Sequence, residues 1–314
     1  MQSARICYRE SKGPPECAKV KEMRREIEQA VALLTKKDEG AVEEALELLQ
    51  GTVFSFSMKV CGRREDAEDT MQEVLVKSLP HLSKFDTPHA LLVWLYRVAK
   101  NCCLMSRRRS KFAPKQDLSL DQLMPDRLEL ELLSKEGPTT PESQAIRNQQ
   151  ACRLREAVQK LPPQYRIILV LRDMEGLTEE EVAEITGLRS GTVRVRLHRA
   201  RLFVRKELAQ AGQTASNSRG CFARSTVADS GPSVKRPVSC KALFAELSNY
   251  LDEKLDDSMC GKLERHLDGC EPCKAFLASL ESAIGQLRHL PPESLNRARV
   301  AKLRRELLSH FPSF

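Results

Sequence analysis

Residues 177–208 restrict the possible folds more than any other stretch of the chain. Thr178 is a suitable N-cap residue, and Glu181 follows at the capping-box position with further acids in the first turn. Gly187 suits the left-handed residue that ends a helix, and Ser190 can cap a second helix. The pattern therefore predicts two helices joined by a short turn.

The second of these predicted helices is strongly basic. From Arg189 to Lys206 there are seven Lys or Arg residues and no acid. Five arginines share one face of the helix: Arg194, Arg196, Arg199, Arg201 and Arg205. Arginine can pair with guanine edges in the major groove and can hold phosphate. A solvated basic face is the plainer alternative, but an acidic helix, a glycine turn and a basic helix in succession favour a DNA-binding helix-turn-helix.

The composition favours a helical protein. Aromatic residues make up 5% and glycines number 14 in 314 residues, which suits helices better than β-sandwiches or barrels. Lys and Arg number 51 against 43 Asp and Glu, and this formal charge of +8 suits a polyanionic partner. The sequence contains neither an apolar run of the roughly 18 residues that a membrane span needs nor the apolar core of a signal peptide. We therefore expect an all-α fold, no membrane partner and a cytoplasmic location.

Prolines and polar stretches divide the chain into blocks. Residues 113–144 hold four prolines and seven acids against three basic residues, which indicates an extended acidic linker. Small and polar residues dominate 211–239, which indicates a flexible linker. The expected domains are an N-terminal, partly helical extension at 1–39, a helical bundle at 40–112, the acidic linker at 113–144, a helix-turn-helix domain at 145–210, the flexible linker at 211–239, a small Cys/His domain at 240–290 and a C-terminal helix at 291–314.

Two further stretches stand out in the first block. DAEDTMQEV at 66–74 places an acidic face beside apolar positions, and WLYRVAKN at 94–101 spaces its apolar residues as on one side of a helix. A basic run follows at 107–111. Taken singly, each stretch is an ordinary amphipathic helix, so only their combination and order can indicate a function.

Together these stretches resemble an extracytoplasmic-function (ECF) sigma factor, the two-domain minimal form of the sigma-70 family. DAEDTMQEV is similar to region 2.2, WLYRVAKN to regions 2.3 and 2.4, and residues 161–201 to region 4. The resemblance extends over residues 40–210. It implies an RNA polymerase sigma factor, which directs promoter-specific transcription initiation and is not an enzyme. It also implies two helical sigma domains joined by an extended linker.

The resemblance further implies which partners these regions meet. Region 2.2 would bind the β′ coiled coil of core RNA polymerase through five residues: Asp66, Glu68, Asp69, Gln72 and Glu73. Region 4 would meet the β flap of the polymerase and the −35 element of double-stranded promoter DNA. The residues implied for the −35 element are Arg189, Ser190, Thr192, Arg194, Val195, Arg196, His198, Arg199 and Arg201.

Regions 2.3 and 2.4 would open and read the −10 element, where melted bases can stack on aromatic rings. The residues implied for this element are Phe85, Trp94, Tyr96, Arg97, Lys100, Asn101, Arg107 and Arg108. Trp94, the only tryptophan, also has the spacing of a core residue, and we expect a buried position for it rather than a base contact.

The C-terminal block contains a metal-binding pattern. His266, Cys270 and Cys273 form His-x3-Cys-x2-Cys, which places two ligands on one helical face and a third thiolate beyond a short Gly/Pro turn. Chance rarely produces this triplet, even with eleven cysteines in the chain. Cys240 can complete a closed set of three sulfurs and one nitrogen, which is typical of structural Zn²⁺. Cys260 is the alternative fourth ligand, and we favour Cys240.

This spacing, with LSNYLDEKLD at 247–256, is similar to the zinc-binding anti-sigma domain, a family also called "putative zinc-finger". In that family the motif usually belongs to a separate protein that holds a sigma factor inactive. We therefore hypothesise that the domain regulates its own chain by intramolecular docking, through amphipathic helices at 276–290 and 295–308. As alternatives, these helices only complete a small zinc-stapled bundle, or oxidation of Cys270 or Cys273 releases zinc.

Two other classes of protein share some of these features. A helix-turn-helix transcriptional regulator with a zinc-dependent dimerisation or sensing domain explains the basic helix and the Cys/His block, but not the stretches at 66–74 and 94–101. A thiol oxidoreductase built on Cys270 and Cys273 would need a strand before its first cysteine, and no strand pattern precedes it.

Overall fold

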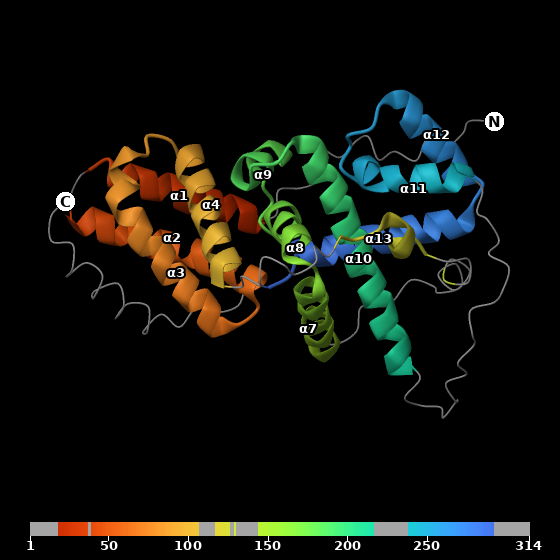
Figure 1. Cartoon of the computed structure of the whole chain (residues 1–314), viewed down its shortest axis with the longest axis horizontal. Coiled ribbons are helices and arrows are strands. Elements are labelled where there is room, and N and C mark those ends of the chain that lie inside the picture. Colours follow the sequence, from red (N-terminus) through yellow and green to blue (C-terminus); the bar gives the residue numbers. More distant parts are fainter. Residues whose placement is uncertain are drawn as a thin grey trace. The chain divides into compact units, whose positions relative to one another are not determined.

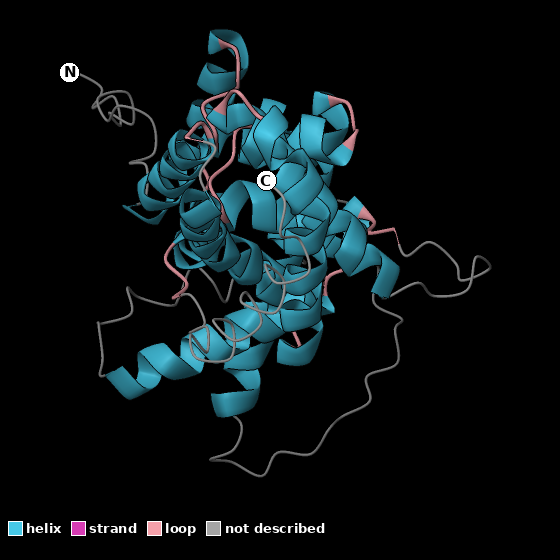
Figure 2. Ribbon diagram, turned by 90° about the vertical axis from the view of Figure 1, so that its left-hand side faces the viewer, coloured by secondary structure: helices cyan, strands magenta, loops and turns pink. Residues whose placement is uncertain are grey.

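A computed structural model of the chain describes residues 18–36, 39–106, 117–125, 129, 144–216 and 238–291. Within these residues every regular element is helical and no strand occurs, which confirms the expected all-α fold (Figure 2). No described helix combines the length and the hydrophobicity that crossing a bilayer requires. The chain folds as two compact units.

The first unit contains four long helices and a short helix from later in the chain (Figure 1). Its elements are α1 (Ala18–Leu34), α2 (Glu39–Cys61), α3 (Arg64–Ser78), the 3-10 helix η1 (Leu79–Lys84), α4 (Pro88–Ser106) and the segment Met174–Ile185, which holds most of α9 (Glu179–Thr186). Because α2 packs against α1, α3 and α4, apolar side chains of all four helices share one core. Within it Phe56 meets Tyr96 edge to face, with 5.0 Å between the ring centroids.

The second unit is built around α10, a helix of 27 residues (Figure 1). Its elements are α5 (Leu120–Leu123), α7 (Gln144–Lys160), α8 (Pro163–Leu169), most of the π-helical turn η2 (Val170–Met174), α10 (Ser190–Ser216), α11 (Val238–Leu251), α12 (Asp257–Asp268) and α13 (Glu271–Arg288). The same face of α10 that carries Leu202 contributes to a core with Phe244 and Leu247 of α11 and Phe276 and Leu280 of α13. The C-terminal domain is therefore packed on α10 through apolar side chains.

The helix boundaries around the turn follow the predicted capping signals. The backbone N–H of Glu181 donates to Oγ1 of Thr178 at 3.2 Å, and the N–H of Thr178 donates to Oε2 of Glu181 at 2.7 Å, which confirms the capping box. Gly187, just after α9, has a φ of +71°. α10 begins at Ser190, so Arg189 and not the predicted Ser190 holds the cap position, and it runs on to Ser216, beyond the expected domain end at residue 210. Residues 211–216 contain helix-forming Ala and Gln, which continue the helix.

Several predictions fall partly outside the described residues. The acidic linker is described at 117–125, 129 and 144, and includes α5. The greater part of the flexible linker, residues 217–237, and the predicted C-terminal helix from 292 onward lie outside, as does Met1–Cys17.

Candidate DNA-reading surfaces and metal centre

The predicted −35 residues lie on the N-terminal half of α10 and just before it, and their environments differ. Three are exposed: Arg189, Arg194 and Val195. Four are half-buried: Ser190, Thr192, Arg196 and Arg199. The remaining two, His198 and Arg201, are buried, with 7% and 1% of their surface exposed. The first turns of the helix are therefore open to a partner, whereas the following turn is covered.

Arg201 is held between two carboxylates. Its Nε and Nη2 donate to Asp173 at 2.8 and 2.7 Å, and its Nη1 and Nη2 donate to Asp252 at 2.7 and 3.0 Å. Burial opposes charge on these groups, but the guanidinium outweighs it and lowers the pKa of Asp173, while the carboxylates raise the pKa of Arg201. Because Asp252 directly follows α11, this buried charge cluster links α10 to the C-terminal domain.

His198 makes the neighbouring contact with the same helix. Its Nδ1 lies 2.8 Å from Oγ of Ser248 on α11. Burial, together with the positive charges of Arg201 and Arg199, lowers the pKa of His198 to about 4. The imidazole is therefore neutral at pH 7, and it fills an interface between helices.

Arg205 extends these contacts to α13. Its guanidinium carbon lies 4.2 Å from the ring centroid of Phe276, and its Nε donates to Oγ of Ser279 at 3.0 Å. Its Nη1 also donates to the carboxylate of Glu129 at 2.8 Å. Although Arg205 shares the predicted basic face, its side chain is committed to packing inside this unit.

Sequence reasoning missed the role of Asp252. It stands in the stretch LSNYLDEKLD, where it reads as one of several surface acids. The sequence indicates only that an acid follows an amphipathic helix and that a basic helix occurs elsewhere in the chain. This pattern does not say which arginine Asp252 contacts.

The predicted polymerase-contact residues lie on α3. Four of the five are exposed or half-buried: Asp66, Asp69, Gln72 and Glu73. The fifth, Glu68, is buried and accepts a hydrogen bond from Nε of Arg64 at 2.9 Å. An acidic edge of α3 thus stays accessible to a basic partner surface. Glu68 instead pairs with Arg64 within the same helix.

The aromatic residues predicted for the −10 element have separate roles in the structure. Trp94 is half-buried and not buried as expected, and its ring centroid lies 5.5 Å from that of Phe85 and 5.6 Å from that of His81. Tyr96 is buried and its hydroxyl donates to Glu175 at 3.0 Å. Burial and the adjacent Glu175 raise the pKa of Tyr96. The rings of Trp94 and Phe85 are therefore the accessible part of this aromatic set.

The polar residues predicted for the −10 element follow on α4. Arg97 and Asn101 are exposed and Lys100 is half-buried. Arg107 and Arg108 lie outside the described residues.

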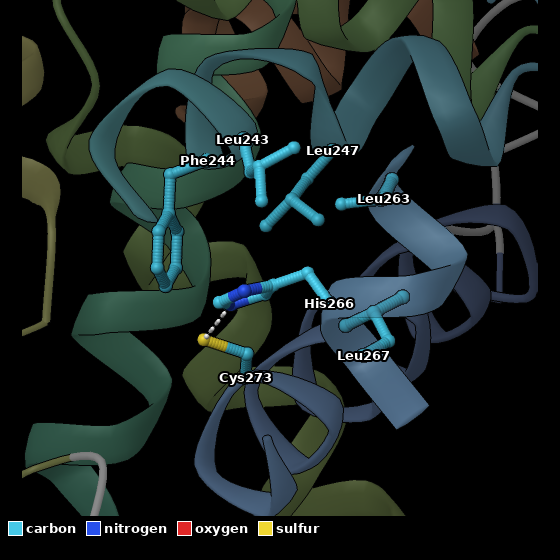
Figure 3. A pocket seen from close by; sticks show the side chains of 7 residues that line it. All are labelled: Leu243, Phe244, Leu247, Leu263, His266, Leu267 and Cys273. Carbon is cyan, nitrogen blue, oxygen red and sulfur yellow. Dashed lines mark hydrogen bonds between the residues drawn. The ribbon is translucent and has the colours of Figure 1, made fainter. Parts of the chain in front are cut away.

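Three of the predicted metal ligands are brought together, and Figure 3 shows two of them, His266 and Cys273. His266 lies in the last turn of α12, Cys270 is the N-cap residue of α13, and Cys273 lies in the first turn of α13. Their ligand atoms all lie within 4.8 Å of one another, and Nε2 of His266 lies 3.3 Å from Sγ of Cys273. Apolar side chains of α11 and α12 line the space beside them: Leu243, Phe244, Leu247, Leu263 and Leu267. The cluster could hold a metal ion.

This donor set fits a tetrahedral metal with nitrogen and sulfur ligands. Zn–N and Zn–S bonds of about 2.0 and 2.3 Å separate neighbouring ligand atoms by about 3.5–3.8 Å, close to the spacing seen here. Cys260 is not part of the cluster, and its Sγ lies 3.5 Å from Oε1 of Glu264. Cys240 belongs to α11, but its side chain lies outside the described part of the chain.

Family comparisons coincide with these three surfaces. Residues 46–112 match "Sigma-70 region 2", which covers most of α2 and all of α3 and α4. Residues 153–204 match "Sigma-70, region 4", and residues 240–274 match a family described as "Putative zinc-finger". The last match contains all three clustered ligands.

Curated relatives carry names of one class. The chain is 27% identical over 184 residues to the ECF RNA polymerase sigma factor SigW of Bacillus subtilis, which covers 58% of this chain and 96% of the relative. It is 31% identical over 159 residues to the ECF RNA polymerase sigma factor SigE of Mycolicibacterium smegmatis, covering 50% and 58%. It is 28% identical over 184 residues to the RNA polymerase sigma-H factor of Pseudomonas aeruginosa, covering 58% and 93%.

A region 2 helical bundle followed by a region 4 helix-turn-helix defines a transcription initiation factor. The chain carries sigma-70 region 2 and region 4 domains, followed by a putative zinc-finger domain, and its curated relatives are named ECF RNA polymerase sigma factors.

Proposed function

We propose that this chain is an ECF RNA polymerase sigma factor whose C-terminal zinc domain controls region 4 within the same molecule. The observation that carries the proposal is the packing of α11 and α13 on α10, in a chain that matches both sigma regions. Region 2 would meet the polymerase β′ coiled coil through the acidic edge of α3, and region 4 the β flap and the −35 element. The protein would act by binding and not by catalysis, in the cytoplasm where polymerase meets promoter DNA.

The contacts on α10 support control of DNA reading. Two of the predicted −35 residues, His198 and Arg201, are buried against α11 and its C-terminal end. Arg189, Arg194 and Val195 stay exposed, so the docked domain would remove part of the reading surface rather than all of it.

A structural zinc ion would stabilise the docked domain. His266, Cys270 and Cys273 would hold it, with Cys240 as the proposed fourth ligand, and the ion would join the end of α12 to the start of α13 and to α11. Because Phe276 and Leu280 lie on α13, fixing the start of that helix also fixes the side chains that pack on α10.

Transcription in vitro tests the sigma function. We expect the full-length protein to bind core RNA polymerase and to start transcripts from a genomic library at a limited set of promoters. A helix-turn-helix regulator would bind DNA without co-purifying with core polymerase and would not support initiation, which would refute the proposal.

Point variants test control by the C-terminal domain. We expect Asp252→Asn, which removes one carboxylate from buried Arg201, to raise promoter-directed transcription towards the level of a protein truncated after Ser216. Glu253→Gln is the matched control, because this neighbouring acid is exposed, and it should behave like the wild type. Equal activity of wild type, Asp252→Asn and truncated protein would refute control in cis while leaving the sigma function intact.

A further inference from the structure

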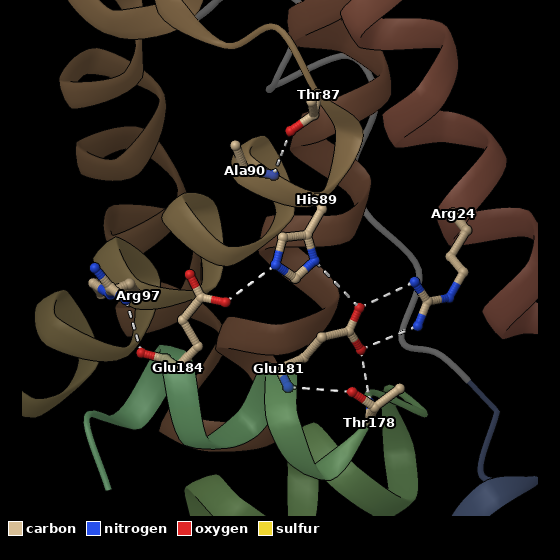
Figure 4. A network of polar contacts seen from close by, with 8 residues as sticks. All are labelled: Arg24, Thr87, His89, Ala90, Arg97, Thr178, Glu181 and Glu184. Atoms are coloured by element: carbon tan, nitrogen blue, oxygen red, sulfur yellow. Dashed lines mark hydrogen bonds and ion pairs between the residues drawn. The ribbon is translucent and has the colours of Figure 1, made fainter.

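Helix α1 lies outside all three family matches and still contacts a functional element. It packs on α2 and α4 through buried Met23, Ile27 and Ala30. On another side it carries Arg24, whose Nη1 and Nη2 donate to Oε1 and Oε2 of Glu181 at 3.2 and 3.1 Å (Figure 4). Glu181 belongs to α9, the first helix of the predicted helix-turn-helix, and this helix lies in the same compact unit as α1 and α4.

The carboxylate of Glu181 is fixed by several donors. Besides Arg24, it accepts from the backbone N–H of Thr178, and Nδ1 of His89 lies 3.8 Å away. Burial would raise the pKa of Glu181, but the hydrogen bonds from Arg24 and Thr178 outweigh it and lower this pKa. The start of α9 is therefore held by a charged, two-point contact from α1.

The other end of α9 contacts the predicted −10 residues of α4. Nη2 of Arg97 donates to the carbonyl oxygen of Glu184 at 2.8 Å (Figure 4), and Nζ of Lys100 donates to that of Ile185 at 2.9 Å. The last carbonyls of a helix lack intrahelical partners and carry partial negative charge, so they attract cations. Nε2 of His89 adds a contact of 3.1 Å to the carboxylate of Glu184.

Charge complementarity extends along the whole segment. The segment Met174–Ile185 carries five acids: Glu175, Glu179, Glu180, Glu181 and Glu184. Three of these acids pair with side chains of α1, α2 and α4: Glu181 with Arg24, Glu175 with Lys59 and Glu184 with His89. Arg97 and Lys100 of α4 donate to the last carbonyls of the segment. A cationic surface that accepts an acidic segment is also a surface that accepts a nucleic acid backbone.

We propose that α1 is a strap that holds α9 over the −10-reading face of α4, so that α9 and promoter DNA compete for Arg97 and Lys100. The inference rests on the proposed sigma function for the identity of the competitor, but the strap itself does not depend on it. In the free protein the last carbonyls of α9 accept the hydrogen bonds of Arg97 and Lys100. Binding of DNA requires α9 to leave, and the strength of the Arg24–Glu181 pair sets how often it does.

Chemical modification of Lys100 tests the strap directly. The variant is Arg24→Glu, which replaces the pair with repulsion, and the matched control is Arg25→Glu, which makes the same charge change at the exposed neighbouring position. Acetylation of Lys100 by an N-hydroxysuccinimide ester is followed by peptide mass spectrometry and normalised to exposed Lys84. Hydrogen exchange of the α9 amides is measured on the same samples.

We expect Arg24→Glu to accelerate both Lys100 acetylation and α9 exchange by roughly five- to tenfold, because the variant removes an ion pair and adds a like-charge repulsion of similar size beside Glu181. Arg24→Lys, which keeps the charge but loses the two-point contact, should give a smaller increase and guards against a folding defect in the reversed variant. Unchanged rates in Arg24→Glu, or equal increases in Arg25→Glu, would overturn the strap.

A binding measurement then tests the competition. The probe is a fluorescent single-stranded DNA of mixed sequence, and Arg24→Glu should bind it several-fold more tightly than wild type or Arg25→Glu, because a larger fraction of the protein is open. Opening of α9 without a gain in DNA affinity would refute the competition. Neither readout uses polymerase, so a failure of transcription would refute the proposed sigma function without bearing on the strap.

Discussion

The two helices of the helix-turn-helix are held by different forces in their two units. α9 buries Val182 and Ile185 and is held at its rim by polar contacts: Arg24, 32% exposed, pairs with Glu181, and Arg97 and Lys100 donate to its last carbonyls. α10 is held by an apolar core that includes Phe244 and Phe276.

The charged groups of the two contacts differ in the same way. Arg201 in α10 is completely buried between two aspartates, whereas the arginine and lysine that hold α9 keep part of their surface in water. Partly exposed ion pairs contribute less than about 1 kcal/mol each and weaken in salt. Apolar burial contributes about 25 cal/mol per Å² and does not weaken in salt. The contact of α9 is therefore weak enough for DNA to replace it. Separating the C-terminal domain from α10 requires more free energy.

Loss of a metal ligand should have the largest effect, and this effect should be confined to the second unit. We expect Cys270→Ser to abolish stoichiometric zinc and to unfold α12 and α13, because structural zinc contributes about 10–16 kcal/mol in comparable small domains. Metal analysis and hydrogen exchange measure both outcomes. Protection of the α9 amides should stay unchanged, since α9 lies in the other unit.

The fourth ligand can be identified in the same experiment. Cys240→Ser should lower zinc affinity and Cys260→Ser should not, since Cys260 lies outside the cluster. The opposite result would assign the fourth position to Cys260.

Truncation of a core aromatic should have the next largest effect. Phe276 is completely buried, meets Phe244 edge to face at 4.9 Å and supports the guanidinium of Arg205. We expect Phe276→Ala to lower the free energy of unfolding of the second unit by about 3–5 kcal/mol, measured with urea. Phe203 is only half-buried on α10, so Phe203→Ala should cost clearly less, and equal losses would contradict a core centred on Phe276.

Local features were predictable from the sequence. The capping box of Thr178 and Glu181 and the turn at Gly187 depend on residues a few positions apart, so their pattern determines the structure. The grouping of His266, Cys270 and Cys273 was predictable for the same reason, because a helical turn and a short loop fix their spacing.

Long-range partners were not predictable. An arginine on an amphipathic helix gives the same pattern whether it meets a phosphate or a carboxylate. Arg201 pairs with acids 28 and 51 positions away, and Arg24 with an acid 157 positions away. The sequence therefore identified a basic helix and could not tell which of its arginines meet the C-terminal domain.

Acid should weaken the contact of α10 through His198. Its pKa is about 4 in the folded protein against an ordinary value of 6.5, so the unfolded or undocked form binds the proton more tightly. Neutral His198 contributes fully to the free energy of unfolding above pH 6.5. This contribution falls as the pH drops to about 4, by up to about 1.4 kcal/mol per pH unit and about 3 kcal/mol in all.

A matched variant separates this titration from protonation of the metal ligands. Urea unfolding of the second unit is compared between wild type and His198→Asn across this range. The difference between the two proteins should shrink or reverse in sign as the pH falls, and a constant difference would show that His198 does not drive the acid sensitivity.

Salt should have the smallest effect, and it distinguishes the two contacts within one sample. The Debye length falls from about 10 Å at 0.1 M to about 3 Å at 1 M ionic strength. This weakens the pair of partly exposed Arg24 and buried Glu181 by less than about 1 kcal/mol. We expect hydrogen exchange of the α9 amides to accelerate by a few-fold at high salt, while the amides of α11, held on α10 by apolar contacts, keep their rates. Equal acceleration of amide exchange in α9 and α11 would contradict the proposed difference between polar and apolar attachment. If Arg24→Glu still responded to salt as strongly as wild type, contacts other than the strap pair would account for the screening.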